Sequence, residues 1–398
     1  MKIAIIKPDY RIIGGFEIVV QIIEEGLKTF GHDIDIIKVD MLEKRYELGD
    51  LVIPENIYNK NEEFFRYTMS IREYEKLNLD NYDLVISTQP PSFAIKHPNI
   101  MVLFYHHLKI YYDLYDVYLE CIAKDKGIHE YSKQIIRKID SSYINNSKFY
   151  LAGSEHVAKR LQMFNEIERK NIEVFRAGID DKYYNYNGEI KYEKPICVGR
   201  HEFPKRPELF IHAMKFLPNM EGKLIGHGGK TEELKIIDKY LQYTLETGVS
   251  VDDEKLWKKI VFNTSKLKYN IKNKSNVIFS GKVSQEELMM EYANSLCVIC
   301  PAFEEDYGLT AIEAMSFSKP VIVCNDGGGF VEFIKDGENG FIVEPTGEAI
   351  AEKIKLLYEN KELAKKMGKN AYEFSRKYNW ESAIKQINNY IRKKEGEF

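Results

Sequence analysis

Cysteine is scarce in this sequence, long hydrophobic runs are missing and positive charge is not in excess. Five cysteines among 398 residues are too few for the disulfide framework of a small secreted protein. No hydrophobic run reaches the roughly 18–20 residues that span a bilayer, and Met1 leads directly into a short apolar stretch without a signal-like region. The net charge of −4 gives no general reason to expect a nucleic-acid partner. We therefore predict a cytoplasmic protein that binds no nucleic acid.

Four of the five cysteines lie in apolar runs that are typical of buried strands. Cys297 and Cys300 have the C-x-x-C spacing of a redox or zinc pair, but alternate residues of a strand point to opposite faces of its sheet. We therefore predict reduced core thiols and no metal site.

A dinucleotide-binding fingerprint is also missing, because no G-x-G-x-x-G follows any predicted strand. This argues against a dehydrogenase that uses nicotinamide or flavin. The chain instead alternates short runs rich in Ile and Val with amphipathic stretches, the pattern of βα units that build a mostly parallel sheet. Its 398 residues exceed the ~250–300 at which a single core stops growing. We predict an α/β protein with two doubly wound, Rossmann-like domains.

The predicted elements divide at a polar, turn-rich stretch. We assign residues 1–182 to the first domain, 183–194 to a linker and 195–377 to the second domain. Strands are predicted at 2–6, 33–39, 83–87, 100–105, 149–153 and 172–175 in the first domain, and at 195–199, 223–225, 277–280, 296–300, 320–324 and 341–343 in the second.

Residues 230–275 are long for one connection in such a sheet, so we predict a helical insertion there. Its lysines could contact an anionic acceptor, although charge runs are usually solvated faces. These lysines are Lys255, Lys258, Lys259, Lys266, Lys268, Lys272 and Lys274.

Two cations follow a predicted strand of the second domain. Arg200 comes directly after strand 195–199, and Lys205 precedes a helix that Pro207 opens. Open α/β sheets bind ligands at the carboxyl ends of their strands, and a helix N-terminus adds positive charge there. The two side chains would suit a phosphate, although they could equally solvate a loop.

Two carboxylates follow the next buried strand. Glu305 lies in a loop, and Glu313 lies eight residues later in a predicted helix among apolar neighbours, where an ionised carboxylate needs a partner. A ligand hydroxyl would supply one. The alternative is that Glu313 pairs with a protein cation and that Glu305 caps the helix.

Glycines and histidines mark other candidate contacts. Gly14 and Gly15 follow the first strand, and the Gly226–Gly229 and Gly327–Gly329 stretches follow strands of the second domain. Glycine lets the backbone approach a ligand closely. His106 and His107 end a first-domain strand, and we expect His106 at a ligand site rather than in the core.

Taken together, these residues resemble the retaining glycosyltransferases of family 4, which share the GT-B fold. The most specific element is the E-x7-E motif from Glu305 to Glu313. Further matching segments occur in the same order: Gly14-Gly15, Ser154-Glu155, Gly178-Ile179-Asp180, Gly199-Arg200 with Lys205, Lys319-Pro320, Gly328-Gly329, Glu332 and Asp336–Gly340. The chain departs from the family at Ala177, and at Arg206 and Pro207 where a glycine is common.

The resemblance implies a role for each candidate. Arg200 and Lys205 would bind the donor diphosphate, Glu305 the transferred sugar and Glu313 the ribose, while His106 would lie near the sugar's primary hydroxyl. His107 stands where many members carry an aspartate, so the choice between the two histidines stays open. The resemblance implies further donor contacts from Gly14, Gly15, Gly226, Tyr307, Gly308, Leu309 and Thr310. It also implies that a C-terminal helix, 378–398, crosses back to the first domain, that the domains face a cleft, and that no cofactor or metal is needed.

The implied activity is transfer of a hexose from GDP-mannose or UDP-glucose, with retention of configuration, to a glycan or glycolipid acceptor in polysaccharide or glycoconjugate biosynthesis. Two alternatives stay open: a nucleotide-sugar epimerase of the same fold, and a non-catalytic nucleotide-sugar-binding scaffold. Tyr111, Tyr115 and Tyr118 form a stripe on one helix face, which could stack on sugars, contact the inner face of a membrane or pack inside the protein.

Overall fold

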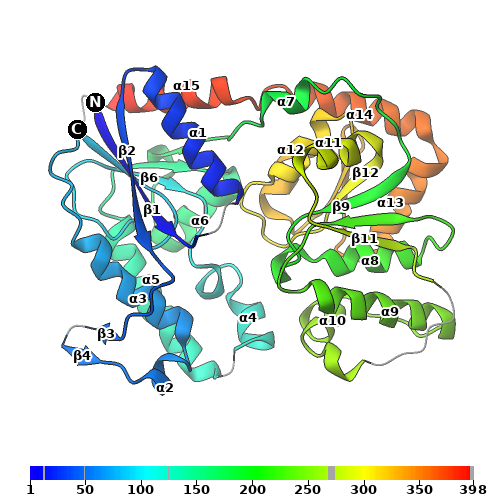
Figure 1. Cartoon of the computed structure of the whole chain (residues 1–398), viewed down its shortest axis with the longest axis horizontal. Coiled ribbons are helices and arrows are strands. Elements are labelled where there is room, and N and C mark those ends of the chain that lie inside the picture. Colours follow the sequence, from blue (N-terminus) through cyan, green and yellow to red (C-terminus); the bar gives the residue numbers. More distant parts are fainter. Residues whose placement is uncertain (12–13, 49, 124, 268–273, 395–398) are drawn as a thin grey trace. The chain divides into compact units, whose positions relative to one another are not determined.

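The computed structural model describes residues 1–11, 14–48, 50–123, 125–267 and 274–394, which form two compact units (Figure 1). The first unit contains Met1–Gly178 and Trp380–Phe398, and the second contains Ile179–Asn379. Residues 183–194, predicted as the linker, lie within the second unit.

The first unit contains a six-stranded parallel sheet in the order β2-β1-β5-β6-β7-β8. All six strands were predicted, and β5, β6 and β7 are buried along their whole length, which explains their continuous apolar sequences. The strands are β1 (Lys2–Asp9), β2 (Asp33–Asp40), β5 (Leu84–Ser87), β6 (Ile100–Phe104), β7 (Phe149–Ala152) and β8 (Ile172–Val174). The helices are α1 (Gly15–Thr29), α2 (Glu55–Tyr58), α3 (Glu62–Glu75), η1 (Lys109–Tyr111), α4 (Tyr115–Cys121), α5 (Lys126–Ile144), α6 (Glu155–Asn165), η2 (Arg169–Asn171) and α15 (Trp380–Lys394).

The second unit repeats this architecture with a parallel sheet in the order β11-β10-β9-β12-β13-β14. Its strands, also predicted, are β9 (Lys194–Val198), β10 (Gly222–Ile225), β11 (Val277–Gly281), β12 (Ser295–Cys300), β13 (Val321–Cys324) and β14 (Gly340–Val343). The α-helices are α7 (Asp181–Tyr184), α8 (Pro207–Lys215), α9 (Thr231–Thr247), α10 (Asp253–Lys258), α11 (Gln285–Asn294), α12 (Leu309–Ser316), α13 (Gly347–Glu359) and α14 (Lys361–Ser375). The 3-10 helices are η3 (Phe203–Lys205), η4 (Ile260–Phe262), η5 (Thr264–Lys266) and η6 (Gly328–Phe333).

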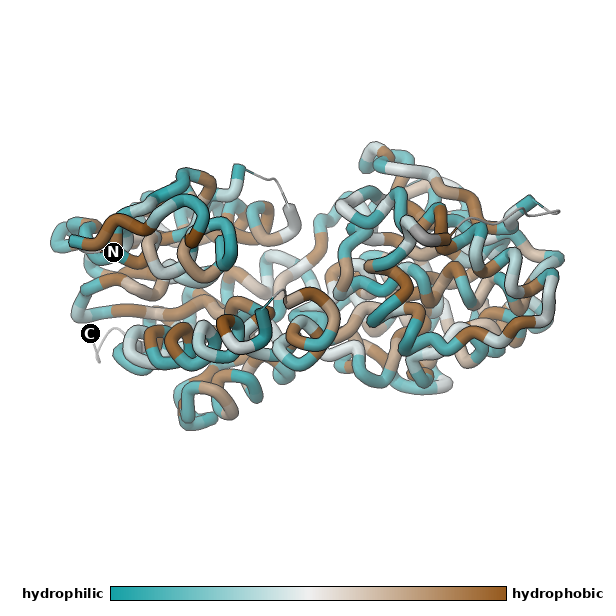
Figure 2. Tube along the Cα trace, turned by 90° about the horizontal axis from the view of Figure 1, so that it is seen from below, coloured by the Kyte–Doolittle hydropathy of each residue, from teal (hydrophilic) through white to brown (hydrophobic). Residues whose placement is uncertain are grey.

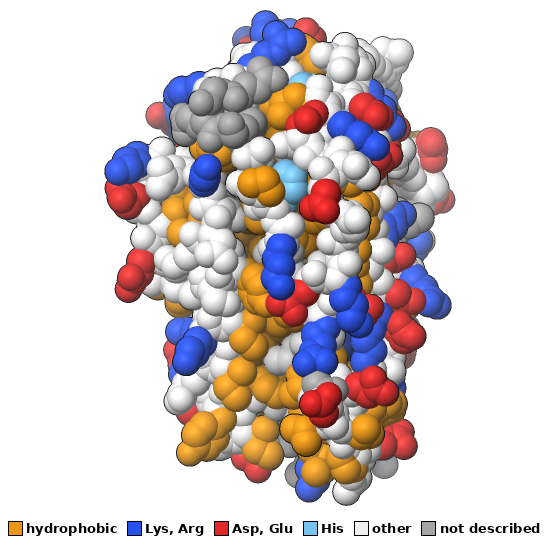
Figure 3. All heavy atoms as spheres, turned by 90° about the vertical axis from the view of Figure 1, so that its left-hand side faces the viewer, with side chains coloured by type: hydrophobic (Ala, Val, Ile, Leu, Met, Phe, Trp, Pro, Cys, Tyr) orange, Lys and Arg blue, Asp and Glu red, His pale blue; other side chains and the backbone are white. Residues whose placement is uncertain are grey.

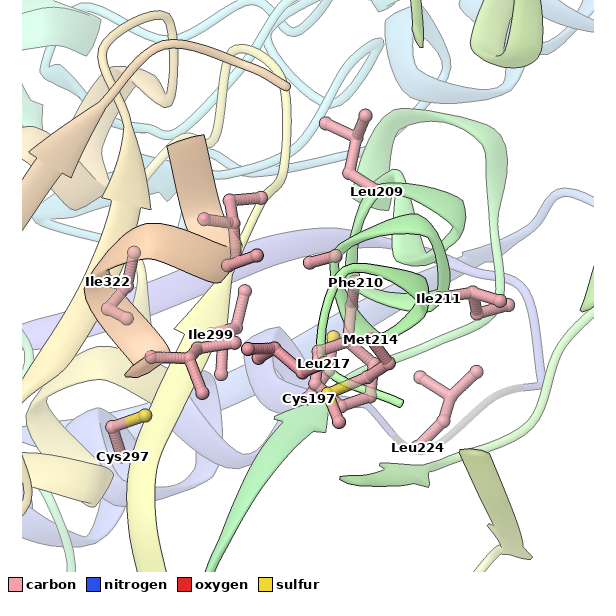
Figure 4. Packing of buried hydrophobic residues seen from close by; sticks show 14 of the residues in the cluster. Cys197, Leu209, Phe210, Ile211, Met214, Leu217, Leu224, Cys297, Ile299 and Ile322 are labelled. Atoms are coloured by element: carbon pink, nitrogen blue, oxygen red, sulfur yellow. The ribbon is translucent and has the colours of Figure 1, made fainter. Parts of the chain in front are cut away.

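Each unit has its own core between sheet and helices. In the second unit, Phe210 and Met214 of α8 pack against Cys197 of β9 and Leu224 of β10 (Figure 4). Hydrophobic and hydrophilic residues follow one another along the helices (Figure 2), as expected for helices with one buried and one exposed face. Cys197, Cys297, Cys300 and Cys324 are free and buried, and burial raises the pKa of each thiol, so the predicted core thiols are confirmed.

Helix α15 completes the first unit, as the resemblance implied. It packs against α1 through an apolar face in which Ile384, Ile387 and Ile391 are buried. Asn388 Oδ1 accepts a hydrogen bond from Nε2 of the buried His32 at 2.9 Å. The last helix in the sequence is therefore part of the unit that begins at Met1.

A two-stranded hairpin of β3 (Glu47–Leu48) and β4 (Leu51–Val52) was not predicted, because each strand has only two residues. Leu51 and Val52 are 66% and 70% exposed. Figure 3 shows hydrophobic side chains gathering at the lower end of the face it presents, the level at which Figure 1 places β3, β4 and α2. Among the described residues, no helix combines the length and the apolar composition needed to cross a membrane.

The tyrosine stripe serves internal packing. Tyr111, Tyr115 and Tyr118 all stack on the ring of His129 in α5, with ring centroids 4.8, 5.4 and 4.7 Å away. The hydroxyl of Tyr115 also donates to Glu130. Packing, one of the three alternatives for this stripe, is what the structure shows.

Helix α5 carries a carboxyl group, Asp140, into the core of the first unit. Its two oxygens accept hydrogen bonds from the hydroxyls of Tyr67 and Tyr112, the latter at 2.8 Å. Burial raises the pKa of Asp140 to about 7, because the hydroxyls compensate the lost hydration only in part. The group is therefore protonated in the folded state at pH values where it is ionised in the unfolded chain.

This difference predicts a pH dependence of stability. As the pH rises from about 4 to about 7, unfolded Asp140 releases its proton while the folded group keeps it, so the free energy of unfolding should fall by up to about 4 kcal/mol. Asp140→Asn, which is neutral in both states, should lose this fall and exceed the wild type in stability at pH 7. Urea unfolding at several pH values measures the effect. Parallel pH profiles for the two proteins would contradict it.

Candidate functional site

The candidate site in the second unit begins where β9 ends. The segment after β9 is held to the segment after β10 by two backbone hydrogen bonds, from Gly199 N to Ile225 O at 3.0 Å and from His201 N to His227 O at 3.2 Å. Between them, Arg200 is exposed, and its guanidinium has no hydrogen-bond or ion-pair partner among the described residues. Arg200 is thus a cation available to a ligand at the carboxyl edge of the sheet.

Lys205 and Glu305, one hundred residues apart in the sequence, form an ion pair between Nζ and Oε2. The backbone brings them together, because Phe303 N donates to Pro204 O at 2.8 Å. Their side chains are 29% and 17% exposed, so a ligand can still reach both. The structure therefore places Lys205, predicted to bind phosphate, and Glu305, predicted to bind the sugar, in one cluster.

Glu313 lies on the second turn of α12 and is partly buried. The hydroxyl of Tyr292, from α11, donates to its Oε2 at 3.0 Å. Burial raises the pKa of Glu313, and the hydrogen bond from Tyr292 opposes that rise. The partner expected from the apolar setting of Glu313 is thus a tyrosine rather than a cation.

Helix α12 begins immediately after Gly308, and the N–H groups of its first residues, Leu309 and Thr310, have no carbonyl one turn earlier to bind. Gly308 has a φ of +107°, and a Cβ there would lie 2.5 Å from the ring of Phe330. Only glycine allows this tight entry into the helix. The result is a helix N-terminus beside the loop that carries Glu305, which suits an anion.

Two other predicted donor contacts have structural reasons of their own. Gly226 has a φ of +132°, and a Cβ there would lie 1.9 Å from the carbonyl oxygen of Gly199, so the fold itself requires glycine. The ring of Tyr307 is buried and packs edge to face on Phe333 at 5.4 Å. The structure thus explains both residues by packing alone. Any contact of Gly226 or Tyr307 with a donor would come from the backbone.

The structure distinguishes the two adjacent histidines of the first unit. His107 is fully buried, stacks on Tyr112 at 3.9 Å and donates from Nε2 to Asn165 at 2.7 Å. Burial lowers the pKa of His107 to about 3, so it stays neutral. His106 is only partly buried, and its Nδ1 donates to the carbonyl of His107 at 2.7 Å, which leaves Nε2 for another contact. His106 is therefore the histidine that a ligand could reach.

Gly14 and Gly15 also belong to the first unit, at the start of α1. Gly14 N donates to the carboxylate of Glu17 at 3.0 Å, which caps the helix. Glu17 in turn lies 3.5 Å from Nζ of the buried Lys7. An anion approaching this helix end would meet a carboxylate as well as the free N–H groups.

The insertion lysines give little support to an anion-binding surface. Lys255 and Lys258 pair with Asp252 and Glu254 on the same helix, at 3.3 and 2.7 Å. The side chain of Lys266, together with Lys268 and Lys272, lies outside the described residues. No cluster of three or more His, Cys, Asp and Glu side chains that could hold a metal occurs in the described ranges.

Tyr292, Trp257 and Asp326 adjoin this cluster, and no sequence pattern indicated them. Arg206 departs from the family pattern, and its backbone has a φ of +47°, in the left-handed region that favours glycine. A bulky residue at a glycine-like position was the signal that this arginine has a specific function in the structure.

Two doubly wound α/β units, the second carrying this cluster at the carboxyl edge of its sheet, give the chain the GT-B fold. Solved structures agree with it. Sucrose-phosphate synthase from Thermosynechococcus elongatus has a TM-score of 0.67 at 18% identity and covers 98% of both chains. HepE from Anabaena, solved in complex with UDP-glucose, has a TM-score of 0.65 at 15% identity and covers 99% of this chain and 100% of that one. The predicted fold class is confirmed.

Residues 187–374 match the family described as Glycosyl transferases group 1. An uncharacterised glycosyltransferase of Methanocaldococcus jannaschii is 35% identical over 136 residues, which are 34% of this chain and only 37% of that relative. The alpha-1,3/1,6-mannosyltransferase ALG2 of Dictyostelium discoideum is 23% identical over 99% of this chain and 98% of its own length. The family match falls entirely within the second unit, which contains Arg200, Lys205, Glu305 and Glu313.

Proposed function

We propose that the protein is a retaining glycosyltransferase of family 4 that transfers a hexose from a nucleoside diphosphate sugar. The observation that carries the proposal is the cluster of Lys205, Glu305 and the α12 N-terminus at one edge of the second sheet. A diphosphate needs cations and N–H donors, and a sugar needs carboxylates that accept from its hydroxyls. This cluster offers both within one site.

In the proposed complex, Arg200 and Lys205 bind the diphosphate together with the first N–H groups of α12. Glu305 accepts from hydroxyls of the transferred sugar, and Glu313 accepts from the ribose. Gly226, Tyr307, Gly308, Leu309 and Thr310 form the surrounding donor surface in this proposal. For Gly14, Gly15 and His106 of the first unit, a donor contact stays a prediction from the family resemblance.

The proposed reaction breaks the bond between the anomeric carbon and the diphosphate oxygen, and the acceptor oxygen forms the new bond on the same face. The nucleoside diphosphate leaves with the bonding electron pair, and the acceptor's proton passes to it or to water. Lys205 and Arg200 stabilise the charge that develops on the leaving diphosphate, which is the largest contribution the protein would make. The mechanism uses no covalent protein nucleophile.

GDP-mannose and UDP-glucose are the proposed donors. ALG2, a mannosyltransferase by name, matches nearly the whole chain, and HepE, which has the same fold, was crystallised with UDP-glucose. The proposed acceptor is a glycan or a glycolipid in glycoconjugate or polysaccharide biosynthesis. With a glycolipid acceptor the protein would work at the inner face of a membrane. Co-sedimentation of the purified protein with lipid vesicles tests this membrane contact, and a protein that does not sediment with them would count against it.

Thermal unfolding with UDP-, GDP-, ADP- and TDP-sugars tests the donor site, because a ligand that binds only the folded state raises its stability. One nucleotide should stabilise the protein, and Arg200→Ala and Glu313→Ala should each abolish that effect in proteins that still fold. A folded wild-type protein that responds to none of these nucleotides would refute the assigned site.

A further inference from the structure

The strongest unassigned feature of the second unit is the buried guanidinium of Arg206, the residue next to Lys205. Its side chain is 3% exposed and forms a bidentate ion pair with Asp326, in which Nη1 lies 2.8 Å from Oδ2. Its Nε donates to Pro301 O at 2.8 Å and Nη2 to Ala302 O at 3.4 Å. The planar fork of donors thus binds a carboxylate and two carbonyls at once.

These partners are the segments that carry the candidate donor site. Pro301 and Ala302 follow β12 and begin the loop that carries Glu305. Asp326 follows β13, and its carbonyl accepts a hydrogen bond from Glu304 N at 3.0 Å. Arg206 therefore connects the segment that carries Lys205 to the segment that carries Glu305 and to the turn after β13 that contains Asp326.

The insertion supplies the cover over this arginine. Trp257, on α10, lies with its ring 5.0 Å from the guanidinium of Arg206, and the ring of Phe303 lies on the same group at 5.5 Å. The indole N–H donates to Phe203 O at 3.2 Å, and the rings of Phe203 and Trp257 stack at 5.0 Å. The rings of Trp257 and Phe303 also lie 5.1 Å apart. Trp257 therefore touches Arg206, Phe203 and Phe303 of the donor-site segments.

The insertion is itself fixed to the body of the second unit. Asp253, at the start of α10, accepts from His212 of α8 at 2.7 Å and from Gly347 N at the start of α13 at 2.9 Å. Helix α10 is thus held on two helices of the fold while its Trp257 lies over Arg206. Through Trp257 the insertion thus contacts the segments that carry the candidate donor site.

We propose that Arg206 is a positioning residue that fixes the spacing of Lys205 and Glu305, and that the insertion between β10 and β11 serves to hold Trp257 over it. This rests on the proposed function of the site as a donor site. The guanidinium accounts for the unfavourable backbone angle at residue 206, since the bonds it forms are available only from that position. Lysine could not replace it, because an ammonium lacks the fork that reaches a carboxylate and two carbonyls together.

The test compares two isosteric changes that each remove the carboxylate partner of a cation in the second unit. Asp326→Asn removes the carboxylate partner of Arg206. The control Glu291→Gln removes the carboxylate partner of Lys223, 2.6 Å away, and lies outside both the site and the insertion. Arg206→Lys and Trp257→Ala complete the set. The probes are UDP-glucose with UMP, and GDP-mannose with GMP, used in binding and turnover measurements on the full chain.

Arg206→Lys, Asp326→Asn and Trp257→Ala should each lower kcat/KM for the donor, by about 100-fold in the case of Arg206→Lys, since small displacements of reacting groups are this costly. They should also reduce the preference for the diphosphate sugar over the monophosphate. Glu291→Gln should leave that preference unchanged. An unchanged preference in Arg206→Lys and Asp326→Asn, or an equal change in Glu291→Gln, would overturn the inference while the donor site stands. A wild-type protein that binds neither nucleotide sugar would overturn the proposed function and this inference together.

Discussion

Lys205→Ala is expected to slow glycosyl transfer by about 100- to 1000-fold, the usual effect of removing one preorganised group that stabilises charge in a transition state. The ammonium of Lys205 is the cation that the structure places beside Glu305. Loss of the pair should change the free energy of unfolding by less than about 1 kcal/mol, because both side chains are partly exposed. Steady-state transfer rates with a saturating donor measure the effect.

The second unit contains a well-matched control pair. Lys223 and Glu291 lie 2.6 Å apart and are 27% and 22% exposed, close to the values for Lys205 and Glu305. Lys223→Ala should leave the transfer rate unchanged to within about twofold, as for substitutions outside a functional site. A folded Lys205→Ala protein as active as Lys223→Ala would remove Lys205 from the proposed site.

Glu305→Gln should have opposite effects on nucleotide binding and on transfer. The carboxylate of Glu305 is paired with Lys205, so a diphosphate that binds Lys205 competes with a group of like charge. Removal of that charge should tighten binding of UDP or GDP alone by about tenfold, equivalent to about 1.4 kcal/mol. Transfer should fall by about 100-fold, because the amide replaces a charged acceptor of the sugar's hydroxyl hydrogens.

Titration calorimetry with the nucleoside diphosphate and a transfer assay separate the two effects. Glu291→Gln serves as the control, since it neutralises a carboxylate in an equivalent ion pair outside the site. Weaker binding of the diphosphate to Glu305→Gln than to the wild type would show that Glu305 does not compete for Lys205.

The sheet architecture was predictable because burial on both faces leaves a clear pattern in the sequence. Each strand from β9 to β14 is a short apolar run between turn residues, and all six matched predictions to within one or two residues. The two-residue strands β3 and β4 carry no such periodicity, so no pattern could indicate them. The insertion was foreseen from its length, but its contacts were not.

The pairing within the candidate site could be predicted only in part. The types and spacing of Lys205 and Glu305 indicated ligand chemistry, and the structure shows them in one ion pair. The partner of Glu313 could not be foreseen, because Tyr292 comes from a different helix and meets it only through tertiary packing. The same holds for Arg206, whose four bonds join segments that are about 100 residues apart in the sequence.

The histidines illustrate the same limit. Two adjacent side chains at a strand end have the same sequence context, and only the packing of Phe164, Tyr112 and Asn165 around His107 determines which one is inside. Burial then explains why His107 carries no positive charge near neutral pH. His106 stays the predicted site residue on the basis of its accessibility.

Proton NMR of the anomeric signals, recorded while the purified protein acts on GDP-mannose or UDP-glucose with a glycan or glycolipid acceptor, tests the central claim most directly. We predict loss of the donor signal, appearance of a glycoside with the donor's anomeric configuration, and a conversion that is about 100- to 1000-fold slower with Lys205→Ala. Inverted configuration in the product, conversion of the donor into another nucleotide sugar without an acceptor, or no consumption of any donor would contradict it.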